Sequence, residues 1–153
     1  MKTRIIICLA ALTLTLSVLF FIYRFCREDL VEINTESIVI DGAYGEEILL
    51  KDITAVELVN ECPLIRKKLN GFGFFNFQKG LFSTSKGEDI NLNFHSKEPP
   101  YLMIKSRNSP TWYINFSKQG TTTNSYLELK KTWSLSRDAS IKQWERIDSE
   151  VTL

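Results

Sequence analysis

The chain has 153 residues, of which 44% are hydrophobic and 24% charged, with seven Gly and four Pro, and this composition excludes disordered, collagen-like and low-complexity classes. Nineteen Lys and Arg against eighteen Asp and Glu leave a net charge of +1, which argues against a nucleic-acid partner bound by bulk charge. One His and three Cys are too few for a zinc or iron–sulfur cluster with its about four ligands, so no metal or cofactor is expected.

The first predicted element is a membrane-spanning helix over residues 5–23, which follows a short basic N-terminus at residues 1–4. Ile5 to Tyr23 contains nineteen residues without a charge, a Pro or a Gly. At a rise of about 1.5 Å per residue this helix is about 28 Å long, close to the ~30 Å hydrocarbon core of a bilayer. The length therefore favours a retained single-pass anchor.

Two other interpretations of this N-terminus are weaker. A cleaved signal peptide has a shorter apolar core followed by small residues, whereas this apolar run ends in the bulky residues 20–23. A lipoprotein processed at Cys26 would need small apolar residues before the cysteine, but residues 23–25 are Tyr, Arg and Phe. The sequence disfavours both alternatives.

The orientation of the helix rests on weaker signals. Two basic residues precede it and two follow it, namely Lys2, Arg4, Arg24 and Arg27. This count gives no preference, but a short basic N-terminus before a single helix usually stays in the cytoplasm, which favours a domain outside the cytoplasm over one inside it. The cysteines do not decide between these two orientations, because Cys26 and Cys62 either form a disulfide or remain two free thiols.

A juxtamembrane linker is predicted over residues 24–35, followed by a β-rich domain over residues 36–135. Apolar and polar residues alternate between turn signals in this domain, a pattern typical of a sandwich or barrel. The predicted strands cover residues 37–41, 46–51, 53–59, 81–85, 90–94, 102–104 and 112–116.

The period of the apolar residues changes after Gly120. Tyr126, Leu129 and Trp133 have helical spacing and predict an amphipathic helix, and residues 136–153 form a polar C-terminal tail. The predicted fold class is therefore mainly β with a C-terminal α-helix, in which the helix covers an open end of a seven-stranded antiparallel barrel.

A basic and aromatic segment lies between the third and fourth predicted strands. It contains a basic triplet, a predicted Asn70-Gly71 hairpin turn and an aromatic run, that is, Arg66, Lys67 and Lys68 followed by Phe72, Phe74, Phe75 and Phe77. The spacing favours core positions for most of the Phe residues, because a small barrel needs large apolar side chains. The alternative is a surface that binds a ligand or lipid through Arg66, Lys67, Lys68, Phe72 and Phe74.

The order of short motifs along the domain resembles that of the bacterial pleckstrin-homology (PH) domain family, which occurs behind N-terminal membrane helices. The matching segments are Ile38 to Leu50, Asp52-Ile53, Asn70 to Gly73, Lys79 to Phe82, Pro99 to Leu102, Trp112 to Phe116 and Tyr126 to Leu129. The resemblance covers residues 36–131. It implies a PH-like seven-stranded barrel and a location in the bacterial cytoplasmic membrane.

The resemblance does not bring a phosphoinositide site with it. PH domains that bind phosphoinositides use Lys and Arg around the first strand connection, because several phosphates require clustered cations. The corresponding residues 41–47 contain Asp41, Glu46 and Glu47 and no basic residue. An anionic lipid partner would therefore have to bind elsewhere.

Catalysis is not expected. His95 is the only His, and it follows the polar phase of the predicted strand over 90–94, which predicts an exposed side chain. A Cys62–His95 pair would need a proximity that the sequence does not indicate, and the chain carries no nucleophile elbow, phosphate loop or dinucleotide fingerprint.

The predicted function is that of a non-enzymatic, membrane-anchored binding domain. Its expected partner is a protein at the membrane, which includes a second copy of this chain, bound through a sheet edge or the terminal helix. The alternative is a lipid- or small-ligand-binding domain that uses the basic and aromatic segment over residues 66–75.

Overall fold

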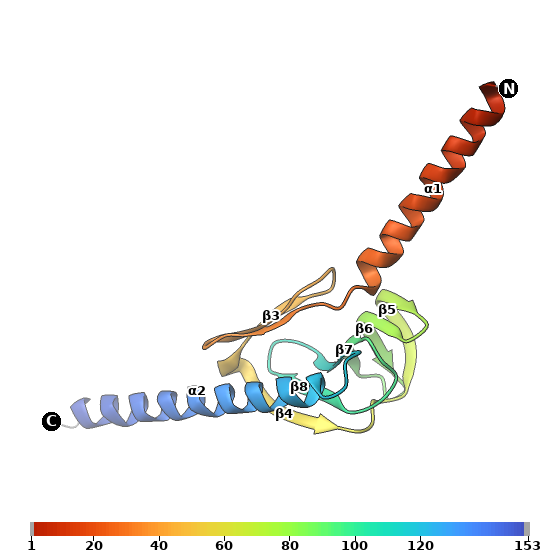
Figure 1. Cartoon of the computed structure of the whole chain (residues 1–153). Coiled ribbons are helices and arrows are strands. Elements are labelled where there is room, and N and C mark those ends of the chain that lie inside the picture. Colours follow the sequence, from red (N-terminus) through yellow and green to blue (C-terminus); the bar gives the residue numbers. More distant parts are fainter. Residues whose placement is uncertain (1, 152–153) are drawn as a thin grey trace.

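Two helices project from opposite sides of a β-domain (Figure 1). The computed structural model describes the chain from residue 2 to residue 151, with side chains at residues 3–24, 27–139, 141 and 142. Helix α1 covers Lys2–Cys26, and the 22 residues Thr3–Arg24 are long and apolar enough to span a membrane. Its apolar side chains are exposed, as expected of a helix surrounded by lipid.

The chain leaves α1 and enters a small antiparallel sheet. The strands are β1 (Val31–Ile33), β2 (Ser37–Ile40) and β3 (Glu46–Leu49), in that order. β2 and β3 lie within the predicted strands over 37–41 and 46–51 and pair antiparallel, with Ile38 opposite Ile48. β1 lies within the segment expected to be a linker, because Val31 and Ile33 pack against the core and β1 pairs with β2.

A 3-10 turn η1 (Leu50–Asp52) leads into a second, six-stranded sheet. Its strands are β4 (Ile53–Val59), β5 (Ile65–Phe74), β6 (Phe77–Thr84), β7 (Asp89–Phe94), β8 (Tyr101–Ser106) and β9 (Thr111–Asn115). The spatial order is β4-β8-β9-β7-β6-β5. β9 therefore lies between β7 and β8, and it runs parallel to β7.

The fold class is confirmed at the level of a mainly β protein with a C-terminal helix. The seven-stranded antiparallel barrel is not, because the described residues form nine strands in two open sheets with one parallel pair. Alternation along a strand identifies its buried face, but it carries no information on which strand is the neighbour.

The two faces of the larger sheet carry separate core clusters. In β8, Leu102 and Ile104 face the cluster shared with the smaller sheet and α2, whereas Tyr101 and Met103 belong to the second cluster. Trp112 is the largest fully buried side chain of the first cluster. Burial on both faces explains the high apolar content of the central strands.

The predicted Asn70-Gly71 turn is wrong. Both residues lie inside β5, where Gly71 pairs with Gly80 of β6, and the chain reverses between Phe74 and Phe77. A Cβ atom on Gly71 would collide with the carbonyl oxygen of Lys79. Gly71 is therefore needed for the close approach of two strands rather than for a turn.

Helix α2 (Thr121–Val151) is longer than predicted and continues through the segment expected to be a polar tail. Its first half packs on the core through Leu129, which is fully buried, and through the half-buried Tyr126 and Trp133. Its second half projects away from the sheets, on the side opposite α1 (Figure 1).

Candidate functional site

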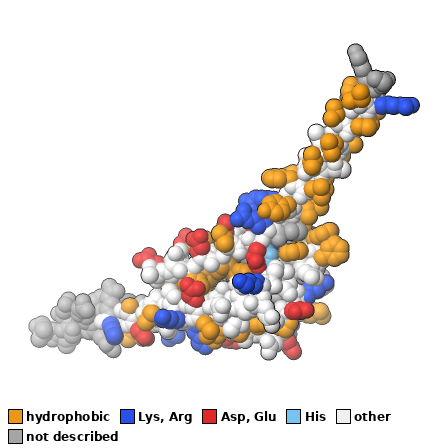
Figure 2. Space-filling view, viewed as in Figure 1, with side chains coloured by type: hydrophobic (Ala, Val, Ile, Leu, Met, Phe, Trp, Pro, Cys, Tyr) orange, Lys and Arg blue, Asp and Glu red, His pale blue; other side chains and the backbone are white. Residues whose placement is uncertain are grey.

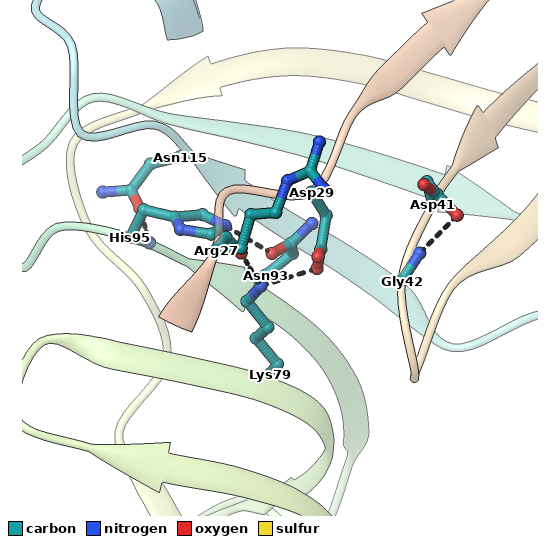
Figure 3. A network of polar contacts seen from close by, with 8 residues as sticks. All are labelled: Arg27, Asp29, Asp41, Gly42, Lys79, Asn93, His95 and Asn115. Carbon is teal, nitrogen blue, oxygen red and sulfur yellow. Dashed lines mark hydrogen bonds and ion pairs between the residues drawn. The ribbon is translucent and has the colours of Figure 1, made fainter. Parts of the chain in front are cut away.

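The base of α1 is fastened to the larger sheet by a buried lysine. Lys79 of β6 is 4% exposed, its Nζ lies 2.8 Å from Asp29 Oδ2, and the same Nζ donates a hydrogen bond of 2.6 Å to the carbonyl oxygen of Arg27. Figure 3 shows Lys79 reaching both residues, which directly follow α1. A buried ammonium is tolerated only with such partners, so the pair fixes the exit of α1 against β6.

Two further contacts hold the same junction. Glu28 accepts a hydrogen bond of 2.8 Å from the backbone N–H of Ser117, just after β9. Gly42, in the connection between β2 and β3, lies so close to Asp29 that a Cβ atom there would be 2.6 Å from its Cγ. Both sheets therefore contact the residues between α1 and β1.

His95 is buried at this junction, so its predicted exposure is wrong. It is 4% exposed, its Nε2 is 3.0 Å from Asn93 Oδ1, and its backbone N–H donates to Asn115 Oδ1. Burial, and secondarily the Lys79 ammonium, lower the pKa of His95 from 6.5 to about 4. The side chain is therefore neutral at pH 7, as a neighbour of a buried cation must be.

The predicted aromatic and basic residues form two separate surfaces. Phe72, Phe74 and Phe75, here named the aromatic turn, lie where β5 ends, and Phe74 and Phe75 are 45% and 78% exposed. The expectation that most of the Phe residues are core is wrong for these two. Their rings stack edge to face with centroids 4.6 Å apart.

The basic triplet lies at the other end of β5. Arg66, Lys67 and Lys68 are exposed, and Lys68 pairs with Phe82 whereas Phe74 pairs with Phe77. Lys68 is four residues of strand from Phe72, or about 13 Å, and six from Phe74, or about 20 Å. The basic triplet and the exposed pair Phe74 and Phe75 therefore lie at different places along β5. β5 is an edge strand, and charged side chains on an edge oppose pairing with other strands.

An open groove lies where α2 leaves the domain. Its volume is about 640 Å³, and its walls are formed by η1, β4, Arg107 after β8 and the middle of α2. The apolar wall residues are Leu50, Ile53, Trp133 and Ile141, and the basic ones are Lys51, Arg107 and Arg137. The guanidinium of Arg137 lies 5.3 Å from the centre of the Trp133 ring. Sequence analysis missed this groove, because it joins segments far apart in the chain.

Cys62 and His95 lie in different surroundings. Cys62 is a free thiol that packs against the second core cluster, and burial raises its pKa to about 11. The side chain of Cys26 lies outside the described residues. Within the described part of the chain, no group of His, Cys, Asp and Glu is placed to hold a metal ion.

Comparisons with known proteins give no relative. A scan of protein-family models, a search of curated proteins and a search of solved structures each return no match. The resemblance to bacterial PH domains therefore remains a prediction from short motifs. The function has to be inferred from the junction, the aromatic turn and the groove.

Proposed function

We propose that this protein is a non-enzymatic, membrane-anchored domain that binds a protein partner in the groove beside α2. The observation that carries the proposal is the groove itself, since apolar walls and three basic residues meet where a helix leaves the domain and remains accessible. The anchor is α1, which is proposed to cross a bacterial cytoplasmic membrane once, with the domain outside the cytoplasm.

The chemistry of the groove favours an acidic, apolar segment of the partner. Lys51 of η1, Arg107 after β8 and Arg137 of α2 line the groove, so a partner carboxylate bound there would face positive charge on several sides. Trp133 and Ile141 supply apolar contact area. An amphipathic helix with apolar residues on one face and acidic residues beside them satisfies both features.

Anchoring lowers the affinity that such a groove needs. A partner in the same membrane meets the domain at a high effective concentration, so modest contacts suffice for binding. The Lys79 junction supports this arrangement, because it holds the domain in a defined position relative to α1.

The expected absence of catalysis remains part of the proposal. A thiol with a pKa of about 11 is protonated at neutral pH and is a weak nucleophile. His95 uses Nε2 to contact Asn93, and it lies beside Lys79 rather than with Cys62. These surroundings favour structural roles for both residues.

Site-specific crosslinking tests the proposal. A photoreactive amino acid at Ile141, inside the groove, is expected to crosslink the full-length chain to a membrane protein. The matched control carries the same group at Leu135, which is an exposed apolar residue of α2 outside the groove.

A charge substitution then tests the chemistry of the partner. Arg137→Glu is expected to lower the affinity for the partner about tenfold, or ~1.4 kcal/mol, and so to reduce crosslinking from Ile141. Lys131→Glu changes an exposed residue outside the groove and is expected to leave the crosslinking unchanged. Equal crosslinking from Ile141 and Leu135, or no loss with Arg137→Glu, would contradict the proposal.

A further inference from the structure

The aromatic turn exposes large apolar side chains at one end of the larger sheet. Phe75 adopts a positive φ of 50° where the chain reverses, and Phe74 and Phe75 point outward with 45% and 78% of their surface exposed. Residues 69–78 carry no charge. An uncharged, aromatic-rich chain reversal is unusual for a surface in contact only with water.

The register of β5 and β6 places this turn beside the base of α1. Phe72 lies opposite Lys79, and Lys79 is the residue that contacts Arg27 and Asp29 directly after α1. Phe77 packs edge to face on His95 of the same junction. The turn is therefore fastened to the exit of α1 by β6 itself.

The figures agree with this placement. In Figure 1 the β5–β6 end of the sheet lies next to the lower end of α1, and in Figure 2 a hydrophobic patch lies at this end of the domain, beside the base of the helix. Tyr23 and Arg24 end the apolar stretch of α1, and such residues mark the level of a membrane interface. The turn lies close to that level.

We propose that the aromatic turn inserts into the interfacial region of the bilayer leaflet at which α1 ends. Phe rings are suited to this region, where they leave water without a demand for hydrogen-bond partners. The inference shares with the proposed function only the premise that α1 spans the membrane, and it does not depend on the groove.

Insertion at a second point would set the orientation of the whole domain. A single helix allows the domain to tilt about its base, whereas a helix and an adjacent turn in the same leaflet restrict that tilt. The basic triplet, which begins about 13 Å from Phe72 and about 20 Å from Phe74 along β5, is not required for this contact. The occupant is therefore the apolar part of the interface rather than an anionic headgroup.

Fluorescence quenching by brominated lipid tests the inference. The full-length chain with Phe75→Trp is reconstituted in phosphatidylcholine vesicles that contain lipids brominated near the glycerol end of the acyl chains. We expect a blue shift and a loss of emission beyond those of the unsubstituted chain, whose own three Trp residues give the background.

The matched control is Ser85→Trp, on an exposed residue beyond the other end of β6, which is expected to show no quenching above background. Equal quenching of the two variants, or none for Phe75→Trp, would overturn the inference. It would also be overturned by quenching that requires phosphatidylglycerol and disappears at high salt, since basic residues would then provide the contact. A blue shift without bromolipid quenching that disappears on dilution of the protein in lipid would indicate a second copy as the occupant instead.

These outcomes separate the two proposals. The vesicles contain no protein partner, so failure of the quenching experiment leaves the crosslinking result at Ile141 unaffected. Folding of each variant is checked by the far-UV circular dichroism of its β-domain and helices in vesicles without bromolipid.

Discussion

The two helices are joined to the β-domain by opposite kinds of contact. At the base of α1 the contacts are polar and buried, with Lys79, Asp29 and His95 enclosed between the sheets and the chain that leaves the helix. At α2 the core contacts are mainly apolar, with Leu129 buried and Tyr126 and Trp133 packed against the cluster. The first arrangement defines a direction for the helix, because charged groups with fixed partners tolerate little displacement. The second leaves an open groove beside the middle of α2.

The largest expected effect is the loss of the buried cation. Lys79→Met leaves Asp29 without its partner in a site where its side chain is only 12% exposed, and removing one member of such a pair costs about 3–5 kcal/mol of unfolding free energy. Urea unfolding of the full chain in detergent measures this loss. Lys86→Met, on an exposed lysine, is the control, with an expected change within about 0.5 kcal/mol.

A double variant sharpens this result. Lys79→Met combined with Asp29→Asn removes both charges, so part of the lost stability is expected to return. Equal losses of stability for Lys79→Met and Lys86→Met would contradict the conclusion that the Lys79–Asp29 pair holds the base of α1 on the larger sheet.

The next effect is the dependence of stability on pH. The folded chain protonates His95 only near pH 4, whereas the unfolded chain does so near 6.5. The unfolded state therefore binds more protons in this window, and stability falls as the pH falls from 6.5 towards 4. Between pH 7 and pH 5 the expected loss is about 2 kcal/mol. His95→Gln should flatten the unfolding profile in this range, and an unchanged slope would contradict the assignment.

A smaller effect is expected at the turn that contacts Asp29. Gly42 has a φ of +110°, and a Cβ atom there would also overlap Asp29. At Gly87, with a φ of +83°, the Cβ would contact no described residue. A left-handed backbone conformation alone costs about 1–2 kcal/mol for a residue with a Cβ. The unfolding free energy of Gly87→Ala is therefore expected to fall by that amount, and that of Gly42→Ala by more. Thermal unfolding of the two variants compares them, and equal losses would argue against a close contact at Asp29.

The smallest effect on stability is expected at the aromatic turn. Phe75→Ser removes a side chain that is 78% exposed, so the unfolding free energy in detergent should change by about 0.5 kcal/mol or less. A loss comparable to that of a buried Phe, about 3–5 kcal/mol, would show that the turn is part of the core after all.

The success of the sequence predictions differs between these regions for physical reasons. The strands β2, β3 and β7 are confirmed because alternation with period two determines a strand within a few residues. His95 was misplaced because alternation assigns it to a polar face, whereas in the fold the Phe77 ring of β6 packs edge to face on the imidazole and Asn93 contacts its Nε2. The Asn70-Gly71 dipeptide misled because glycine serves close packing as well as turns.

The sequence by itself determined the apolar N-terminal helix, the mainly β class and the start of the terminal helix, because each depends on a periodic pattern over neighbouring residues. Only the tertiary structure decided the parallel β7–β9 pair, the burial of Lys79 beside Asp29, and the groove between α2 and β4. Each of these joins residues that are distant in the chain. Their partners are selected by packing of the whole domain, and local propensity carries no record of that choice.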